Sequence, residues 1–177
     1  MNSDGLYPEI KQMEQELMES LIRDYALDIK KIAFLYVNDV MESEDILQEV
    51  FIACYQNLHK FREESSYRTW LIRITINKCK DHHKRWSVRN LFYKASVDPQ
   101  GDFHSAEESL LTKEKTEEMM SQLSHLSSKY KEVLILYYYQ ELTMEEIGKV
   151  LSISSNTVKS RLLRAKKKLK EKLEGGN

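Results

Sequence analysis

The chain has 177 residues, only five Gly and two Pro, and a formal net charge of −1. That length allows one or two domains, and the scarcity of Gly and Pro predicts an all-α protein built from two small helical domains joined by a linker. No apolar run approaches the roughly 18 residues of a membrane span, and the start of the chain does not read as a signal peptide, so we expect a cytoplasmic protein.

The charges lie in alternating blocks. Residues 1–58 carry 4 basic and 12 acidic residues, and residues 59–94 carry 10 and 3. Residues 95–155 carry 5 and 11, and residues 156–177 carry 8 and 2. This pattern predicts two separate basic surfaces. Because the total charge is near zero, the overall field adds little affinity for DNA, and we expect strong DNA binding only with a partner's help.

The first acidic block predicts three helices. Apolar residues at helical spacing indicate a helix over 8–25 and a second from Ile29, followed by a turn over 38–42. Ser43 is the expected N-cap of a helix from Glu44 to about Leu58. Its outward face holds Asp45, Gln48, Glu49 and Ile52. This face is either solvated or a docking surface for a basic helix.

The first basic block predicts a central helix from about Tyr67 to Trp86, after a loop over 60–66. A polar and basic stripe lies along one line of this helix, formed by Thr69, Arg73, Asn77, Lys80 and Lys84. Lys and Arg can follow a phosphate backbone while Asn bonds a base edge, so nucleic acid is a candidate ligand beside a merely solvated face. Trp70 is assigned to the core rather than to base stacking.

The same helix invites an enzymatic interpretation at Asp81, His82 and His83. A helical metal site needs partners at i+4, and no His, Cys or Glu stands four residues after Asp81, His82 or His83. We therefore expect no metal ion, no cofactor and no catalytic residue here. Cys54 and Cys79 lie on apolar faces and are expected to be buried, reduced thiols.

The helical pattern lapses over 87–104, which contains a turn signal at 98–101 and predicts a linker. Ser105 and Glu108 form a possible capping box for a helix to about Gln122. A further helix is expected over 129–140, starting at Ser127 or Ser128.

The last segment predicts a helix-turn-helix. Thr143 and Glu146 form a capping box for its first helix, and Ser154 or Ser155 can cap a second helix that ends near Leu173. An inner stripe contains Val158, Leu162, Ala165 and Leu169, and the opposite face contains Asn156, Lys159, Ser160, Leu163, Arg164 and Lys167. That outer face suits the major groove of DNA, although a solvated basic helix is the alternative. Arg161 lies beside the inner stripe and is expected to bond backbone or phosphate.

Together these segments resemble the extracytoplasmic-function (group IV) sigma factors of bacterial RNA polymerase. The run from Glu44 to Phe51 resembles the family's region 2.2, and Thr69–Leu71 with Ile76 and Asn77 resembles regions 2.3 and 2.4. Residues 130–138 and 142–169 resemble region 4, notably in the run 157–162 and in Arg164-Ala165. The resemblance divides the chain into a region 2 domain over 1–90, a linker over 91–107 and a region 4 domain over 108–177.

The resemblance also implies partners and residue roles. Asp45, Gln48, Glu49 and Ile52 match positions that dock on core RNA polymerase, where the β′ and β subunits are the partners. Melting and capture of the minus-10 promoter strand are implied for Lys60, Phe61, Arg62, Ser66, Arg73, Asn77, Lys80 and Lys84. Recognition of the minus-35 duplex is implied for Asn156, Thr157, Lys159, Ser160, Leu163, Arg164 and Lys167. An anti-sigma factor is an implied regulator, and no small-molecule substrate is implied.

Two residues depart from the family pattern. Gly148 stands where Ala is usual, which lowers helix propensity but allows closer packing. Ser152 stands where the turn usually has Gly, which is a modest cost if the turn needs positive φ.

Two rival functions remain. A regulator with a response-regulator type of helix-turn-helix would bind its operator alone, usually as a dimer, without needing the stripe on the helix over 67–86. A phosphodiesterase using Asp81, His82 and His83 would need bound metal.

Overall fold

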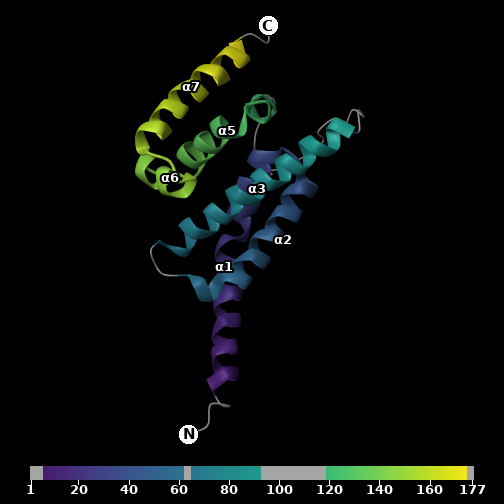
Figure 1. Cartoon of the computed structure of the whole chain (residues 1–177), viewed down its shortest axis with the longest axis vertical. Coiled ribbons are helices and arrows are strands. Elements are labelled where there is room, and N and C mark those ends of the chain that lie inside the picture. The colour runs from purple at the N-terminus through teal and green to yellow at the C-terminus, as the bar shows by residue number, and fades with distance from the viewer. Residues whose placement is uncertain (1–5, 62–64, 93–118, 175–177) are drawn as a thin grey trace, which may run out of the picture.

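The computed structural model describes residues 6–61, 65–92 and 119–174, and these residues form helices without any strand. The N-terminal half contains α1 (Leu6–Val37), α2 (Val40–Asn57), the short turn η2 (Leu58–Lys60) and α3 (Tyr67–Phe92). The C-terminal half contains α5 (Ser128–Leu134), the π-helical turn η3 (Ile135–Tyr139), α6 (Met144–Leu151) and α7 (Ser155–Glu174). Figure 1 shows the C-terminal half lying along one side of the α1–α3 bundle. The all-α prediction is confirmed.

α1 is one continuous helix of 32 residues, where the sequence predicted two. No Gly or Pro lies between the two predicted segments, so nothing ends the helix there. Its C-terminal part is packed into the core through Ile29, Ile32, Ala33 and Tyr36. The N-terminal part extends beyond α2 and α3 (Figure 1).

α2 begins three residues before the predicted cap. Asp39 is the N-cap, because its side chain accepts a hydrogen bond of 2.8 Å from the backbone N–H of Glu42. Ser43 lies inside the helix, fully buried, and its hydroxyl donates to the carbonyl of Val40. The Ser43 prediction was wrong because Asp39, a strong cap residue, was available first.

α3 is the central helix of the N-terminal half, as predicted. Leu71, Ile72, Ile76 and Cys79 are buried against α1 and α2, and the helix runs on to Phe92. It therefore passes its predicted end at Trp86 by six residues and enters the linker predicted over 91–107 by two, while the Ser105–Glu108 capping box lies outside the described residues. Both cysteines are free and buried, which confirms that prediction.

The helix-turn-helix forms as the sequence predicts. Thr143 and Glu146 make the capping box of α6, and the hydroxyl of Ser154 accepts from the N–H of Thr157 at the start of α7. Ser152 ends α6 with φ 56° and ψ 46°, in the left-handed region that favours Gly. The cost anticipated for this residue is therefore present.

Gly148 is explained by the turn that follows it. A Cβ built at this position would lie 2.7 Å from the carbonyl oxygen of Ile153. The backbone of the turn packs directly on α6 here, so Gly allows the closer approach that its low helix propensity would otherwise not justify.

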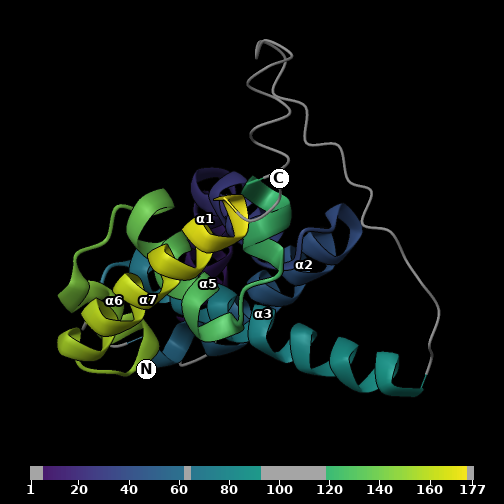
Figure 2. The same ribbon diagram turned by 90° about the horizontal axis from the view of Figure 1, so that it is seen from above.

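The two halves share one hydrophobic core. They pack together along an interface, called the seam below, between α1 and α3 on one side and α5, η3 and α6 on the other. Residues of α5 and α6 face α3 and the C-terminal end of α1, and the two views in Figures 1 and 2 place α5 and α6 beside α3. The seam fixes the position of each half's polar surface relative to the other.

Ser152→Gly tests the strain in the turn. Removing a left-handed non-Gly residue should raise the free energy of unfolding by about 0.5–1 kcal/mol in urea titrations. Ser20→Gly, inside α1, is the control and should lower it by a similar amount. A loss of stability at Ser152 would contradict the assignment.

Candidate functional site

The basic stripe of α3 is only partly open to solvent. Ser66 caps the helix by accepting from the N–H of Thr69, and Asn77 and Lys84 are exposed. Arg73 and Lys80 instead turn toward the C-terminal half. Arg73 donates to the carbonyl of Lys149 at 3.0 Å, and the Lys80 ammonium lies 2.8 Å from a carboxylate oxygen of Glu132. Two cations of the stripe are thus engaged by the C-terminal half, while Asn77 between them stays exposed.

An aromatic cluster stands at the start of α3. The ring centroids of Phe61 and Tyr67 lie 4.3 Å apart in a stacked arrangement, and Phe61 and Trp70 lie 5.1 Å apart. All three side chains are half-buried, and exposed Lys60 precedes them. Trp70 packs against the core, as predicted, yet shares this cluster, which the sequence analysis did not single out. Arg62 lies outside the described residues.

α7 presents the outward face that the sequence predicts. Val158, Leu162 and Ala165 are buried, while Leu163 on the opposite side is 62% exposed. The exposed polar members are Asn156, Lys159, Ser160, Arg164 and Lys167. The hydroxyl of Ser160 donates to the carbonyl of Asn156, and that of half-buried Thr157 lies 2.8 Å from the Ser154 hydroxyl. The cations of this face are therefore more available to a ligand than its hydroxyls.

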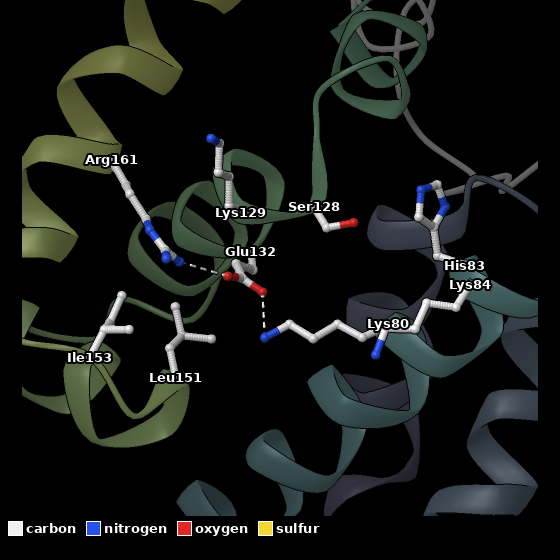
Figure 3. A pocket seen from close by; sticks show the side chains of 9 residues that line it. All are labelled: Lys80, His83, Lys84, Ser128, Lys129, Glu132, Leu151, Ile153 and Arg161. Carbon is white, nitrogen blue, oxygen red and sulfur yellow. Dashed lines mark hydrogen bonds and ion pairs between the residues drawn. The ribbon is translucent and has the colours of Figure 1, made fainter. Parts of the chain in front are cut away.

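Arg161 differs from its prediction. It donates to Glu132 at 3.1 Å instead of bonding backbone or phosphate. Glu132 is 2% exposed and so holds a cation from α7 and another from α3 (Figure 3). No local pattern in the sequence indicates this buried carboxylate, because its partners are distant in the chain.

α2 presents a mixed polar and apolar face away from the bundle. Asp45 and Gln48 are exposed, and Ile52 is 57% exposed. Met41 and Tyr55 are also largely exposed and follow the same helical spacing. The sequence analysis missed these two, although the spacing of three and four residues could have found them.

Glu49 is held within the protein. Its carboxylate lies 3.2 Å from Lys78, 3.4 Å from Arg85 and 3.6 Å from His82. Burial alone would raise the pKa of Glu49, but the hydrogen bonds from Arg85 and Lys78 outweigh it and keep the pKa below its usual value. Glu49 therefore joins α2 to α3 and is less available for docking than its neighbours.

Asp81, His82 and His83 follow one another on α3, with Asp81 and His83 exposed and His82 buried. Within the described ranges, no group of three His, Cys, Asp or Glu side chains is arranged to hold a metal ion. His82 is instead buried beside Glu49.

Lys131 is a buried cation at the seam. It is 3% exposed, and its ammonium donates to the carbonyl of Tyr36 at 2.7 Å and to that of Ser124 at 3.1 Å. It thus caps the C-terminal end of α1, where a positive charge is favourable. Burial nevertheless lowers the pKa of Lys131 to about 8.

The seam also contains an open cavity of about 320 Å³ (Figure 3). Its lining includes four cations, which surround Glu132: Lys80, Lys84, Lys129 and Arg161. Positive charge from both halves therefore gathers at one place.

Comparison with known proteins decides the family. Residues 21–88 match sigma-70 region 2, and residues 116–169 match sigma-70 region 4. The RNA polymerase sigma factor YlaC of Bacillus subtilis is 30% identical over 162 residues, covering 90% of this chain and 93% of that protein. SigZ of the same organism is 34% identical over 139 residues, covering 78% and 77%. The ECF sigma factor SigW, also from B. subtilis, is 27% identical over 174 residues, covering 93% of each chain.

The chain belongs to the extracytoplasmic-function sigma factors of the sigma-70 family. It is a subunit that binds core RNA polymerase and directs promoter-specific transcription initiation.

Solved structures share the fold of this sigma factor. RpoE of Bartonella quintana, in complex with the anti-sigma factor NepR, is 18% identical with a TM-score of 0.75, covering 90% of this chain and 98% of that one. CnrH, in complex with the cytosolic domain of CnrY, is 22% identical with a TM-score of 0.69, covering 92% and 91%. Among the described residues, no helix is long and apolar enough to cross a membrane.

Lys131 gives a pH-dependent test of the seam. Because the folded pKa lies below the usual 10.5, the unfolded chain binds more protons between the two values, and stability rises with pH there. The free energy of unfolding of the wild type, minus that of Lys131→Met, should increase by about 1 kcal/mol between pH 7 and pH 9. Urea titrations at both pH values measure the difference, and a constant or falling value would contradict a buried charged Lys131.

Proposed function

We propose that this sigma factor uses three separate surfaces for core binding, minus-35 recognition and minus-10 melting. The outer face of α2 docks on core polymerase, α7 recognises the minus-35 duplex, and the α3 stripe with the 60–66 loop melts and captures the minus-10 strand. The observation that carries this division is that each surface lies on a different helix, with a different balance of apolar and basic residues.

The α2 face has the character of a protein-docking surface. Asp45 and Gln48 supply polar contacts, while Met41, Ile52 and Tyr55 supply apolar area that is otherwise left in water. An exposed apolar row bordered by acidic residues suits a basic amphipathic helix of a partner. Glu49 has the supporting role of holding α2 against α3.

The α7 face has the character of a major-groove reader. Arg164 and Lys159 can contact guanine edges or phosphates, and Asn156 can contact adenine, while Leu163 offers an apolar contact. The region around α3 suits single-stranded DNA instead. Its cations can follow phosphates, Asn77 can bond a base edge, and the aromatic cluster of Phe61, Tyr67 and Trp70 offers ring faces next to the loop.

We also propose that the chain acts in the cytoplasm, has no catalytic activity of its own and is restrained by an anti-sigma factor. RpoE of Bartonella quintana, which has the same fold, is a sigma factor in complex with an anti-sigma factor. A gel-shift comparison checks the sigma mode of DNA binding, because an operator-binding regulator would shift a DNA fragment without core polymerase, whereas a sigma factor needs the polymerase.

The α2 proposal is tested with Ile52→Ala. Loss of a side chain from the centre of a docking face should weaken binding to core polymerase by roughly tenfold, or about 1–2 kcal/mol. Leu27→Ala on α1 is the matched control, because Leu27 is 65% exposed but lies outside the face. Fluorescence anisotropy with labelled sigma factor measures both, and equal affinities would reject the assignment.

The two DNA surfaces should separate in one experiment with reconstituted polymerase. Arg164→Ala should weaken closed-complex binding by about tenfold, since loss of one base contact costs roughly 1–3 kcal/mol. Asn77→Ala should leave polymerase assembly and closed-complex binding unchanged but slow strand opening, measured by permanganate footprinting. Lys168→Ala on α7 is the charge-matched control. Unchanged transcription with both Arg164→Ala and Asn77→Ala would refute these roles.

A further inference from the structure

The cavity at the seam contains more positive charge than its own lining balances. Two of its cations come from α3 and one each from α5 and α7, and all four line the cavity with a single carboxylate, that of Glu132: Lys80, Lys84, Lys129 and Arg161. Three positive charges of the lining are therefore left without a negative partner there. An anion from solution is the natural counterpart for such a cavity.

Glu132 sets the geometry of the cavity floor. The Lys80 ammonium lies 2.8 Å from one carboxylate oxygen and the Arg161 guanidinium lies 3.1 Å from the other, and Figure 3 shows the two side chains approaching from opposite sides. Arg161 uses only its Nη1 nitrogen in this contact, although a guanidinium has five N–H donors. Lys80 has three donors and directs one to Glu132. Both cations are thus held in place with donors left for a ligand.

Lys84 and Lys129 stand at the rim of the cavity. Both are exposed, and Lys84 lies one turn after Lys80 on α3, while Lys129 lies one turn before Glu132 on α5. Within the described part of the chain, neither of these two lysines forms an ion pair. A lysine side chain is long and flexible, so each can reach an anion from its own side of the seam.

The remaining lining combines two hydrogen-bonding groups with an apolar wall. The hydroxyl of Ser128 and the ring of His83 supply the polar groups. Partial burial and the charge of Lys131 lower the pKa of His83, so its ring is neutral at pH 7 and above. Leu151 and Ile153 form the apolar wall. Because apolar side chains exclude water, they strengthen the attraction between a bound anion and the cations.

The size and charge of the cavity select the class of ligand. At about 320 Å³ it lies at the lower end of the range for small-molecule sites, so it suits a compact ion rather than a continuous nucleic-acid strand. Phosphoryl oxygens are acceptors that Arg and Lys pair with strongly. A chain of two or three phosphates carries several negative charges spread along its length, whereas a sulfate or a carboxylate carries fewer charges at a single point.

We propose that the seam cavity binds a free polyphosphate, either inorganic di- or triphosphate or the phosphate chain of a nucleotide. Lys80 and Arg161 hold it from the floor, and Lys84 and Lys129 hold it from the rim. Two of these cations belong to each half of the protein, so the bound ion contacts both halves and stabilises the folded chain. The site does not rest on the transcription roles proposed above, since Lys129 and Arg161 belong to none of the three surfaces.

The probe is sodium triphosphate, titrated calorimetrically into the full chain at pH 7.5 and about 50 mM NaCl without divalent cations. Triphosphate should bind at least tenfold more tightly than sulfate at equal ionic strength. Excess triphosphate should also raise the melting temperature of the protein by mass action. ATP forms a second arm. Equal affinity for ATP shows that the phosphate chain alone is recognised, and tighter binding shows that a nucleotide also uses the Leu151–Ile153 wall; both results support the site.

Lys84→Ala and Lys129→Ala remove one cation from each half. Each variant loses one charge-assisted hydrogen bond to a phosphate and should bind triphosphate about tenfold more weakly. Both lysines are exposed, so both variants should fold, as circular dichroism spectra establish. Lys168→Ala on α7 is the matched control, because Lys168 is exposed and carries the same charge but does not line the cavity. It should bind triphosphate like the wild type.

The pattern of affinities decides the proposal. Tight triphosphate binding that weakens in Lys84→Ala and in Lys129→Ala but not in Lys168→Ala supports the site. Triphosphate binding no tighter than sulfate binding, or equally weakened in Lys168→Ala, reflects general attraction to positive charge and overturns it. Weakening in only one of the two cavity variants overturns it, because the ion would not span the seam. Binding of a (dT)12 oligonucleotide without binding of triphosphate also overturns it and leaves the proposed DNA surfaces intact.

Discussion

The carboxylate of Glu132 is the constraint on which the arrangement of this sigma factor depends. It is buried on α5 between Lys80 of α3 and Arg161 of α7, so one negative charge links both basic helices. Removing a partner from a buried charge costs several kcal/mol, so both cations contribute to keeping this carboxylate buried. The hydrophobic core shared by both halves holds the carboxylate in place, and the carboxylate in turn fixes how the basic helices sit relative to each other.

This pairing gives the alternating charge blocks a structural meaning. Glu132 comes from the acidic block over 95–155, and its partners come from the two basic blocks on either side. Glu49 of the first acidic block likewise pairs with Lys78 and Arg85 of the first basic block. Acidic residues of both acidic blocks therefore pair with individual cations of the basic helices inside the chain.

The sequence predicts local structure well where the signals are local. The Thr143–Glu146 capping box, the buried stripe of α7 and the central position of α3 all follow from spacings of three and four residues. Asp39 caps α2 in place of Ser43, because cap preference is a choice among nearby candidates, and α1 is continuous because neither Gly nor Pro separates its two predicted segments. The seam was not predictable, since Arg68 and Gln140 are 72 positions apart and Lys131 and Tyr36 are 95 apart. Periodicity identifies a polar stripe but not the element that covers it.

The central claim is that the two halves are joined in the free sigma factor and separate when it acts. Energy transfer between labels at Lys31 on α1 and Lys168 on α7, both exposed, measures this directly. The account predicts high transfer in the free chain and a clear fall when core RNA polymerase is added. Equal transfer in both states would contradict it.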